Sequence, residues 1–279
     1  MDILEYYLLE PLSYPFMQRA LIVSVSIGLV CSIFSCFLIL KGWSLMGDAV
    51  SHAVLPGIAL AYVVGIPLFI GAFIAGLFCA VTIGYVKEHS RVKEDAVMGI
   101  IFSGMFALGL VMLTKIQTDV HLLHILFGNV LGLTSYDLME TVIIAGSCTA
   151  IMILKRRDLM LFCFDPVQAR IVGLSKPLLH FGLLILLSLT IVSSLKAAGI
   201  ILVIAMLITP GAVGFLLARS FDRMMVISVT TSIFSCITGT ILSYHMDVAT
   251  APLIVMIQSL FFLCALGASL VRNHRKVTI

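Results

Sequence analysis

The stretch PLFIGAFIAGLFCAVTIGYV, residues 67–86, carries no charged side chain. A helix needs roughly 20 predominantly apolar residues to cross a bilayer, so this stretch predicts a membrane span. Similar apolar runs follow one another along the rest of the chain. They lie near 17–40, 45–64, 96–114, 136–154, 177–195, 197–218, 224–243 and 249–270. The pattern predicts an all-α, polytopic transmembrane helical bundle of eight or nine spans.

The composition agrees with a membrane-embedded chain. Of the 279 residues, 61% are hydrophobic and 11% are charged, whereas about a quarter of the residues in a soluble domain are charged. No segment is long and polar enough to form a separate soluble domain, so we expect residues 1–279 to form a single transmembrane domain. The formal net charge of +3 is too small to suggest nucleic-acid binding.

Two runs leave the number of crossings open. Run 45–64 contains polar residues, and run 197–218 contains Thr209, Pro210 and Gly211, which should break a helix. Four basic segments should face the cytoplasm, because Lys and Arg are enriched in cytoplasmic loops. They are KEHSRVK (87–93), KRR (155–157), ARSFDR (218–223) and RNHRK (272–276). If nine spans alternate, these four segments share one side, and the N-terminus and residues 115–135 lie outside.

Small residues recur at a spacing of four and predict close helix packing inside the bundle. The rows are Gly71/Ala75, Ala72/Gly76/Ala80 and Gly99/Ser103/Ala107. The seven cysteines are scattered, form no CxxC pair and lie mostly in apolar runs. We interpret them as small core residues and not as disulfides or metal ligands.

Asp48 and His52 stand out because they lie within an apolar run. The other acidic residues fall in predicted loops, in the N-terminal segment or at helix ends. A charge in a bilayer costs at least about 2.5–3.5 kcal/mol on insertion scales, so such residues usually face a cavity and serve a function. Positions 48 and 52 are one helical turn apart and share a helix face. Counted from Lys41 along a helix, they should lie roughly 10 and 17 Å deep, near the middle of the membrane.

A carboxylate and an imidazole on one face suit a divalent cation such as manganese, iron or zinc. The alternative is that Asp48 and His52 bond each other, or neighbouring backbone, and hold two helices together. Two ligands are also too few for a stable metal site. Two copies of the chain facing each other across a pore would supply four ligands, and weak binding is what conduction of a passing ion requires.

A second polar cluster, Asp119, His121 and His124, falls on the predicted outer side. His121 and His124 are three residues apart and share a helix face. These residues could collect metal at an outer entry point or meet an extracellular partner, and ordinary interfacial polar residues are the alternative.

The segment DPVQARIVGLS, residues 165–175, predicts a short capped helix in the largest cytoplasmic loop. Asp165 suits the N-cap, Pro166 the first helical position and Gly173 the C-terminal cap. Exposed Gln168 and Arg170 would suit docking onto a partner, and Ala169 would lie on the docked face. An amphipathic connector is the alternative.

These motifs together resemble the permease subunits of bacterial ABC importers for manganese, zinc and iron. LKGWSLMGDAVSHAVLPGIALAY (40–62) is similar to the early signature of that family, and HILFGNVLGL (124–133) resembles its mid-chain motif, with a lean to the manganese/iron branch. DPVQARIVGLS (165–175) resembles its ATPase-coupling helix, and AAGIILVIAMLITPGAVGFLLAR (197–219) its late discontinuous span.

The resemblance implies a multi-pass protein of the bacterial inner membrane that works in an ATP-driven importer. Its partners would be a cytoplasmic ATPase subunit, an extracytoplasmic metal-binding protein and a second permease copy or paralogue. Asp48 and His52 would line the metal pathway, and residues 165–174 would couple it to the ATPase, through Asp165, Pro166, Gln168, Ala169, Arg170 and Gly173. No cofactor would be permanently bound, and the metal would be the cargo.

The chain contains no G-x-x-x-x-G-K-[ST] phosphate loop, so ATP hydrolysis would belong to the partner subunit and the permease would not itself be an enzyme. Three alternatives explain part of the pattern. They are an ion-coupled secondary metal transporter, an intramembrane metal-dependent enzyme and a purely structural subunit. The residues alone do not rank manganese against iron or zinc.

Overall fold

The computed structural model describes residues 10–115 and 134–277. Throughout these ranges the regular structure is helical. The helices are α1 (Glu10–Leu12), α2 (Pro15–Lys41), α3 (Met46–Val64), α4 (Leu68–His89), α5 (Glu94–Lys115), α7 (Ser135–Leu154), α8 (Arg156–Phe164), α9 (Pro166–Ile171), α10 (Lys176–Leu217), α11 (Phe221–Met246) and α12 (Thr250–Val277). The predicted all-α transmembrane bundle is confirmed.

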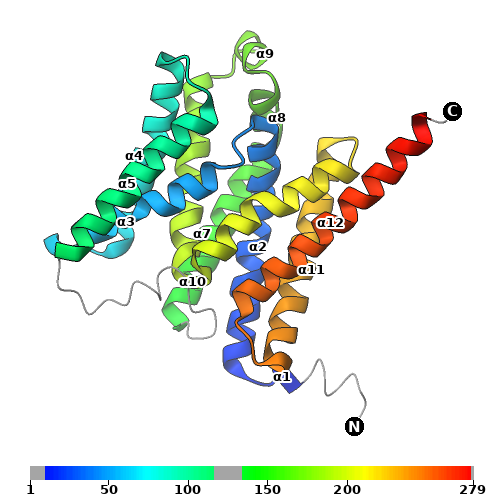
Figure 1. Ribbon diagram of the computed structural model, residues 1–279, viewed down its shortest axis with the longest axis horizontal. Coiled ribbons are helices and arrows are strands. Elements are labelled where there is room, and N and C mark those ends of the chain that lie inside the picture. The colour runs from blue at the N-terminus through cyan, green and yellow to red at the C-terminus, as the bar shows by residue number, and fades with distance from the viewer. Residues whose placement is uncertain (1–9, 116–133, 278–279) are drawn as a thin grey trace.

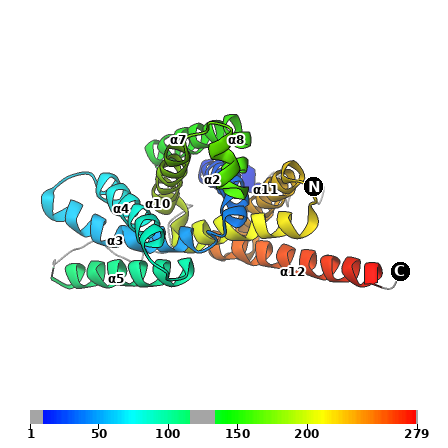
Figure 2. The ribbon, with the colours of Figure 1, turned by 90° about the horizontal axis from the view of Figure 1, so that it is seen from above.

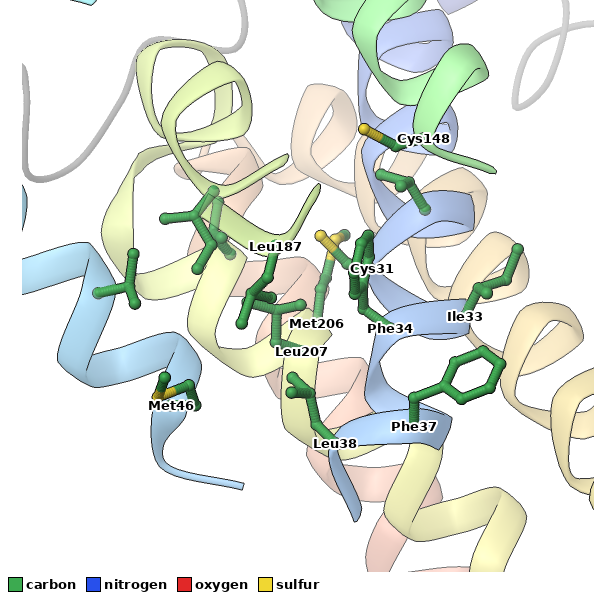
Figure 3. Close-up of a cluster of buried hydrophobic side chains, with 14 of the residues drawn as sticks. Cys31, Ile33, Phe34, Phe37, Leu38, Met46, Cys148, Leu187, Met206 and Leu207 are labelled. Carbon is green, nitrogen blue, oxygen red and sulfur yellow. The ribbon is translucent and has the colours of Figure 1, made fainter. Parts of the chain in front are cut away.

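Helix α2 lies at the centre of the bundle and packs against α7, α10 and α11 (Figure 2). Its apolar side chains meet those of α3, α7 and α10 in the main core, which Figure 3 shows in close-up. Phe34, Phe37 and Leu38 of α2 are fully buried there. The helix is apolar all round, as expected for a span surrounded by other helices.

Eight helices of the described chain are long and apolar enough to cross a membrane. One of them, α10, is 42 residues long and contains Gly199 in a left-handed conformation that interrupts the helix. Figure 1 shows its two arms running from one end of the bundle to the other and back. The arms, residues 176–198 and 200–217, are each long enough to cross, so the structure matches the nine-span alternative.

The helix break expected at Thr209, Pro210 and Gly211 is wrong. The second arm of α10 continues through Pro210. The hydroxyl of Ser35 on α2 donates to the carbonyl oxygen of Ile208 at 3.0 Å and accepts from the backbone N–H of Gly211 at 2.9 Å. The neighbouring helix thereby satisfies the backbone groups that proline frees, which is how such residues are tolerated in membrane helices.

The ends of the helices agree with the predicted orientation. The α4–α5 turn, the α7–α8 junction, the α10–α11 turn and the end of α12 all lie toward the upper end in Figure 1. These places carry the four basic segments, so this end is the cytoplasmic side. Helix α1 and the start of α2 lie at the opposite end.

Two of the three small-residue rows pack as predicted. A methyl group on Gly57 of α3 would overlap the carbonyl oxygen of Gly71 and the side chain of Ala75 on α4. The third row lies differently, because Ser103 and Ala107 of α5 are exposed and nothing lies within 4 Å of a methyl group added at Gly99.

Of the seven cysteines, six are buried, Cys264 is exposed and none forms a disulfide. Cys163 lies on α8, outside the spans, where burial raises the pKa of its thiol to about 12 despite the nearby charge of Lys41. It is therefore a protonated core side chain at neutral pH.

Candidate functional site

Asp48 and His52 lie on α3, whose start is set by the end of α2. Helix α2 stops at Lys41 because Gly42 adopts a left-handed conformation. The backbone N–H groups of Gly42 and Trp43 donate hydrogen bonds to the carbonyl oxygens of Ile39 and Leu38. The chain turns and α3 begins at Met46, then runs obliquely across the bundle (Figure 1).

This turn corrects the depth expected for the pair. The sequence estimate counted a continuous helix from Lys41, whereas Asp48 lies in the first turn of α3. At 1.5 Å per residue, Asp48 is about 3 Å and His52 about 9 Å along the axis from Met46. The pair therefore occupies the beginning of an oblique helix.

The two side chains are in contact. Nε2 of His52 lies 3.2 Å from Oδ1 of Asp48, and the side chains are 24% and 31% exposed. The other ring nitrogen of His52, Nδ1, is buried and has no hydrogen-bond partner in the described chain. The imidazole also packs against Phe102 and Phe106 of α5, with ring centroids 5.9 and 5.1 Å away.

The contact between the two side chains is itself weak. A helical i,i+4 ion pair contributes about 0.3–0.5 kcal/mol, and a carboxylate in the first turn also complements the dipole of α3. Partial exposure on a face that also carries exposed Leu45 leaves both groups accessible to an ion or to another chain.

Close helix contacts fix the orientation of α3. A methyl group at Gly47 would lie 2.7 Å from Cδ1 of Leu207 on α10, and one at Gly109 of α5 would lie 2.9 Å from the backbone nitrogen of Pro56. Together with the Gly57–Gly71 contact, these approaches hold three sides of α3 against α4, α5 and α10. His52 lies on the side that faces α5, where it packs against Phe102 and Phe106, and Asp48 shares that helix face.

The described chain contains no group of three or more His, Cys, Asp or Glu side chains placed to hold a metal ion. Ser51, the nearest hydroxyl in sequence, is buried and donates to the carbonyl oxygen of Gly47 at 2.7 Å. One chain therefore offers Asp48 and His52 as a two-ligand set. Asp119, His121 and His124 lie outside the described residues.

The short helix predicted near 165–174 is present as α9. The Asp165 carboxylate accepts hydrogen bonds from the N–H groups of Val167 and Gln168, at 2.9 and 3.0 Å. Pro166 opens the helix, and Gly173 ends it with a left-handed backbone. Figure 1 shows α9 at the cytoplasmic end of the bundle.

The structure corrects the docking face that the sequence suggested for α9. Ala169 is 0% exposed and packs into the main core of the chain itself, so it cannot contact a partner directly. Gln168 and Arg170 are exposed, as expected. Two apolar side chains that sequence inspection missed, Val167 and Ile171, are 70% and 80% exposed. They form the outer face of α9.

A second site was missed at the other end of the molecule. Lys196, just before the break in α10, forms ion pairs with Asp137 and with Glu140 of α7, the latter at 3.6 Å. Lys196 and Glu140 border a cavity of about 670 Å³ that also contacts Tyr136, Pro67 and Leu195. The signal in the sequence was Lys196 itself, a lone cation between two apolar runs.

A family model described as "ABC 3 transport family" matches residues 13–269. The chain belongs to the ABC 3 transport family. It is therefore a membrane-spanning permease subunit of an ABC transporter, multi-pass in the bacterial inner membrane. The family resemblance expected from the sequence motifs is confirmed.

Relatives and a solved structure support the same assignment of this ABC 3 permease. It is 58% identical to "Chelated iron transport system membrane protein YfeD" of Yersinia pestis, over 99% of this chain and 92% of the relative. It is 56% identical to "Manganese transport system membrane protein MntB" of Synechocystis sp., over 94% and 86% of the two chains. A solved structure, PsaBC from Streptococcus pneumoniae in complex with Fab, is 35% identical with a TM-score of 0.83, covering 94% of this chain and 95% of that chain.

Proposed function

We propose that this permease carries divalent metal, manganese or ferrous iron, into the cell, with Asp48 and His52 binding the ion in transit. The observation that carries the proposal is the contact between Asp48 and His52 on the partly open face of α3. A hard carboxylate oxygen and an imidazole nitrogen suit both metals. The relatives named above for iron and manganese transport support this substrate class.

The transit site is completed by a second permease, either an identical copy or a paralogue. Two ligands from one chain bind an ion weakly, whereas two facing pairs supply two carboxylates and two imidazoles. The row Gly99, Ser103 and Ala107, in which Ser103 and Ala107 are exposed, lies on α5, which packs beside α3. Small residues on an outer helix face allow another helix to approach closely, so this face suits the second permease.

ATP hydrolysis takes place in a separate ATPase subunit that docks on α9. The side chains of Val167 and Ile171 are apolar and exposed at the cytoplasmic end, beside the charged Arg170. Such a mixture suits a protein partner. The caps from Asp165 and Gly173 hold this short helix in shape. An extracytoplasmic metal-binding protein delivers the ion at the opposite end.

Uptake of radiolabelled manganese and iron by cells carrying the permease with its cognate ATPase and binding protein tests the proposal. Wild-type permease should support uptake that stops when the ATPase is inactivated. Asp48→Asn should remove uptake of both metals while the complex still assembles. Metal uptake that continues without ATP hydrolysis would favour an ion-coupled transporter and contradict the proposal.

A further inference from the structure

The imidazole of His52 lies against two phenylalanine rings of α5. The ring centroids of Phe102 and Phe106 are 5.9 and 5.1 Å from that of His52, and Phe106 meets the imidazole at an interplanar angle of 80°. The two phenylalanines are four residues apart and therefore share one face of α5. We call Phe102 and Phe106 the phenylalanine pair.

A close approach between α3 and α5 keeps the phenylalanine pair beside His52. A methyl group at Gly109 of α5 would lie 2.9 Å from the backbone nitrogen of Pro56 on α3. On each helix this contact lies about one turn beyond the aromatic contact. Phe102 also packs against the main core of the bundle. The position of the pair is therefore set by the fold on both sides of the imidazole contact.

The two ring nitrogens of His52 have different surroundings. Nε2 lies 3.2 Å from Oδ1 of Asp48, whereas Nδ1 is buried and has no hydrogen-bond partner in the described chain. The nearest hydroxyl in sequence, that of Ser51, donates to the carbonyl oxygen of Gly47. Nε2 is therefore the nitrogen placed to bind an ion together with Asp48.

Binding an ion at Nε2 changes which nitrogen of His52 carries the hydrogen. A neutral imidazole has one N–H, and without an ion Nε2 donates it to Asp48, because a carboxylate only accepts. When Nε2 binds an ion, the N–H has to be on Nδ1. A metal-binding histidine almost always donates that N–H to an acceptor, and loss of the acceptor typically lowers metal affinity by about 10–100-fold. Within the described chain, Nδ1 of His52 has no such acceptor.

We propose that Phe102 and Phe106 are positioning residues of the transit site, which enclose Nδ1 of His52 and so keep this histidine a weak metal ligand. The inference rests on the proposed function and adds a reason why a bound ion can leave. Conduction requires binding that is weak enough for release. An apolar enclosure of Nδ1 weakens the ligand without moving Nε2 away from Asp48. The phenylalanine pair then sets affinity and release through His52.

An acceptor placed beside the imidazole tests the proposal. Phe106→Gln exchanges the nearer ring for an amide, and binding of Mn²⁺ to the purified permease–ATPase complex is measured from the electron paramagnetic resonance signal of free Mn²⁺. We expect about tenfold tighter binding than in the wild type and slower uptake of Mn²⁺ by vesicles, because release becomes slower. A merely structural role would instead lower both affinity and uptake. Phe106→Leu, which keeps the enclosure apolar, should bring no gain in affinity.

Phe73→Gln is the matched control for the introduced amide. Phe73 is a partly buried phenylalanine of α4 that packs against a separate apolar cluster, so Phe73→Gln should bind Mn²⁺ like the wild type. If Phe106→Gln does not fold, Phe102→Gln makes the same comparison one turn earlier on α5. Binding that is no tighter in the folded glutamine variant than in Phe106→Leu would overturn the proposal.

A double-mutant cycle shows whether the acceptor acts through His52. The gain from Phe106→Gln should disappear in the His52→Ala background. A gain that persists there would mean that the glutamine binds the ion itself, which would also overturn the role of the phenylalanine pair. Unaltered Mn²⁺ binding in Asp48→Asn would instead contradict the transit site, so the two failures are distinguishable.

Discussion

Nε2 of His52 is 3.2 Å from Oδ1 of Asp48, and the other nitrogen of the same ring is buried without a partner. One imidazole thus joins the accessible carboxylate to the aromatic side chains of α5. An ion that enters between Asp48 and His52 would replace their mutual contact. The roles of Asp48 and His52 in ion binding can therefore be tested by substituting each residue separately.

Removing the charge of Asp48 while keeping its shape should stop transport. In Asp48→Asn the amide retains an oxygen but no longer attracts a cation, so we expect metal uptake to fall by at least about tenfold, which is 1.4 kcal/mol. Uptake by membrane vesicles at equal permease content is the measurement. Ser51→Ala is the control that should retain uptake, because the Ser51 hydroxyl is buried and donates to the carbonyl oxygen of Gly47 within α3. Full-rate uptake by Asp48→Asn would remove Asp48 from the pathway.

His52 should make transport sensitive to acid. A metal-binding imidazole needs a free lone pair, and protonation removes it, so wild-type uptake should weaken as the pH falls. His52→Gln should have a much lower rate and a flatter profile on the acid side. The comparison requires uptake to be measured from neutral to mildly acidic pH in both proteins. Identical profiles would show that another group causes the pH dependence.

The contact between Gly57 and Gly71 should tolerate no side chain. Gly57→Ala places a methyl group against the backbone of α4, and we expect a loss of about 1–3 kcal/mol in stability. Gly146→Ala is the matched control, because it is also helical and has open space around it. There the better helix propensity of alanine should leave stability unchanged or slightly raised. Thermal unfolding in detergent measures both.

The outer face of α9 should determine ATPase docking. Ile171→Glu places a charge at a largely exposed apolar position, so it should leave the permease folded and weaken its pull-down of the ATPase. Ala169→Trp should instead damage the permease itself, since Ala169 is packed in the core. Comparing melting temperature with ATPase recovery separates the two effects. Normal recovery and coupled transport in Ile171→Glu would make α9 a simple connector.

The ion pairs of Lys196 should stabilise the packing of α7 against the break in α10. Because its side chain is more than half exposed, the coupling to Asp137 should amount to about 0.2–1 kcal/mol and weaken as salt is added. A double-mutant cycle of Lys196→Ala and Asp137→Ala, followed by thermal unfolding at low and high salt, measures it. Additive single-mutant effects would indicate that the ion pairs are incidental.

Local sequence patterns determined much of this protein. Uncharged runs such as 67–86 fixed the membrane helices, because a bilayer accepts only segments that satisfy their own backbone hydrogen bonds. Asp165, Pro166 and Gly173 fixed the short helix α9, because caps act within a few residues. The spacing of Asp48 and His52 placed them on one face.

Only the tertiary structure decided the features that depend on distant segments. Pro210 lies inside a continuous helix because Ser35, far away in sequence, satisfies the freed backbone. Ala169 faces inward because the core of the chain lies on that side of α9. The depth of Asp48 differs from the estimate made from the sequence, because the chain turns at Gly42 before α3 begins. His52, Phe102 and Phe106 come from two separate helices, and only the packing of α5 against α3 brings their rings together.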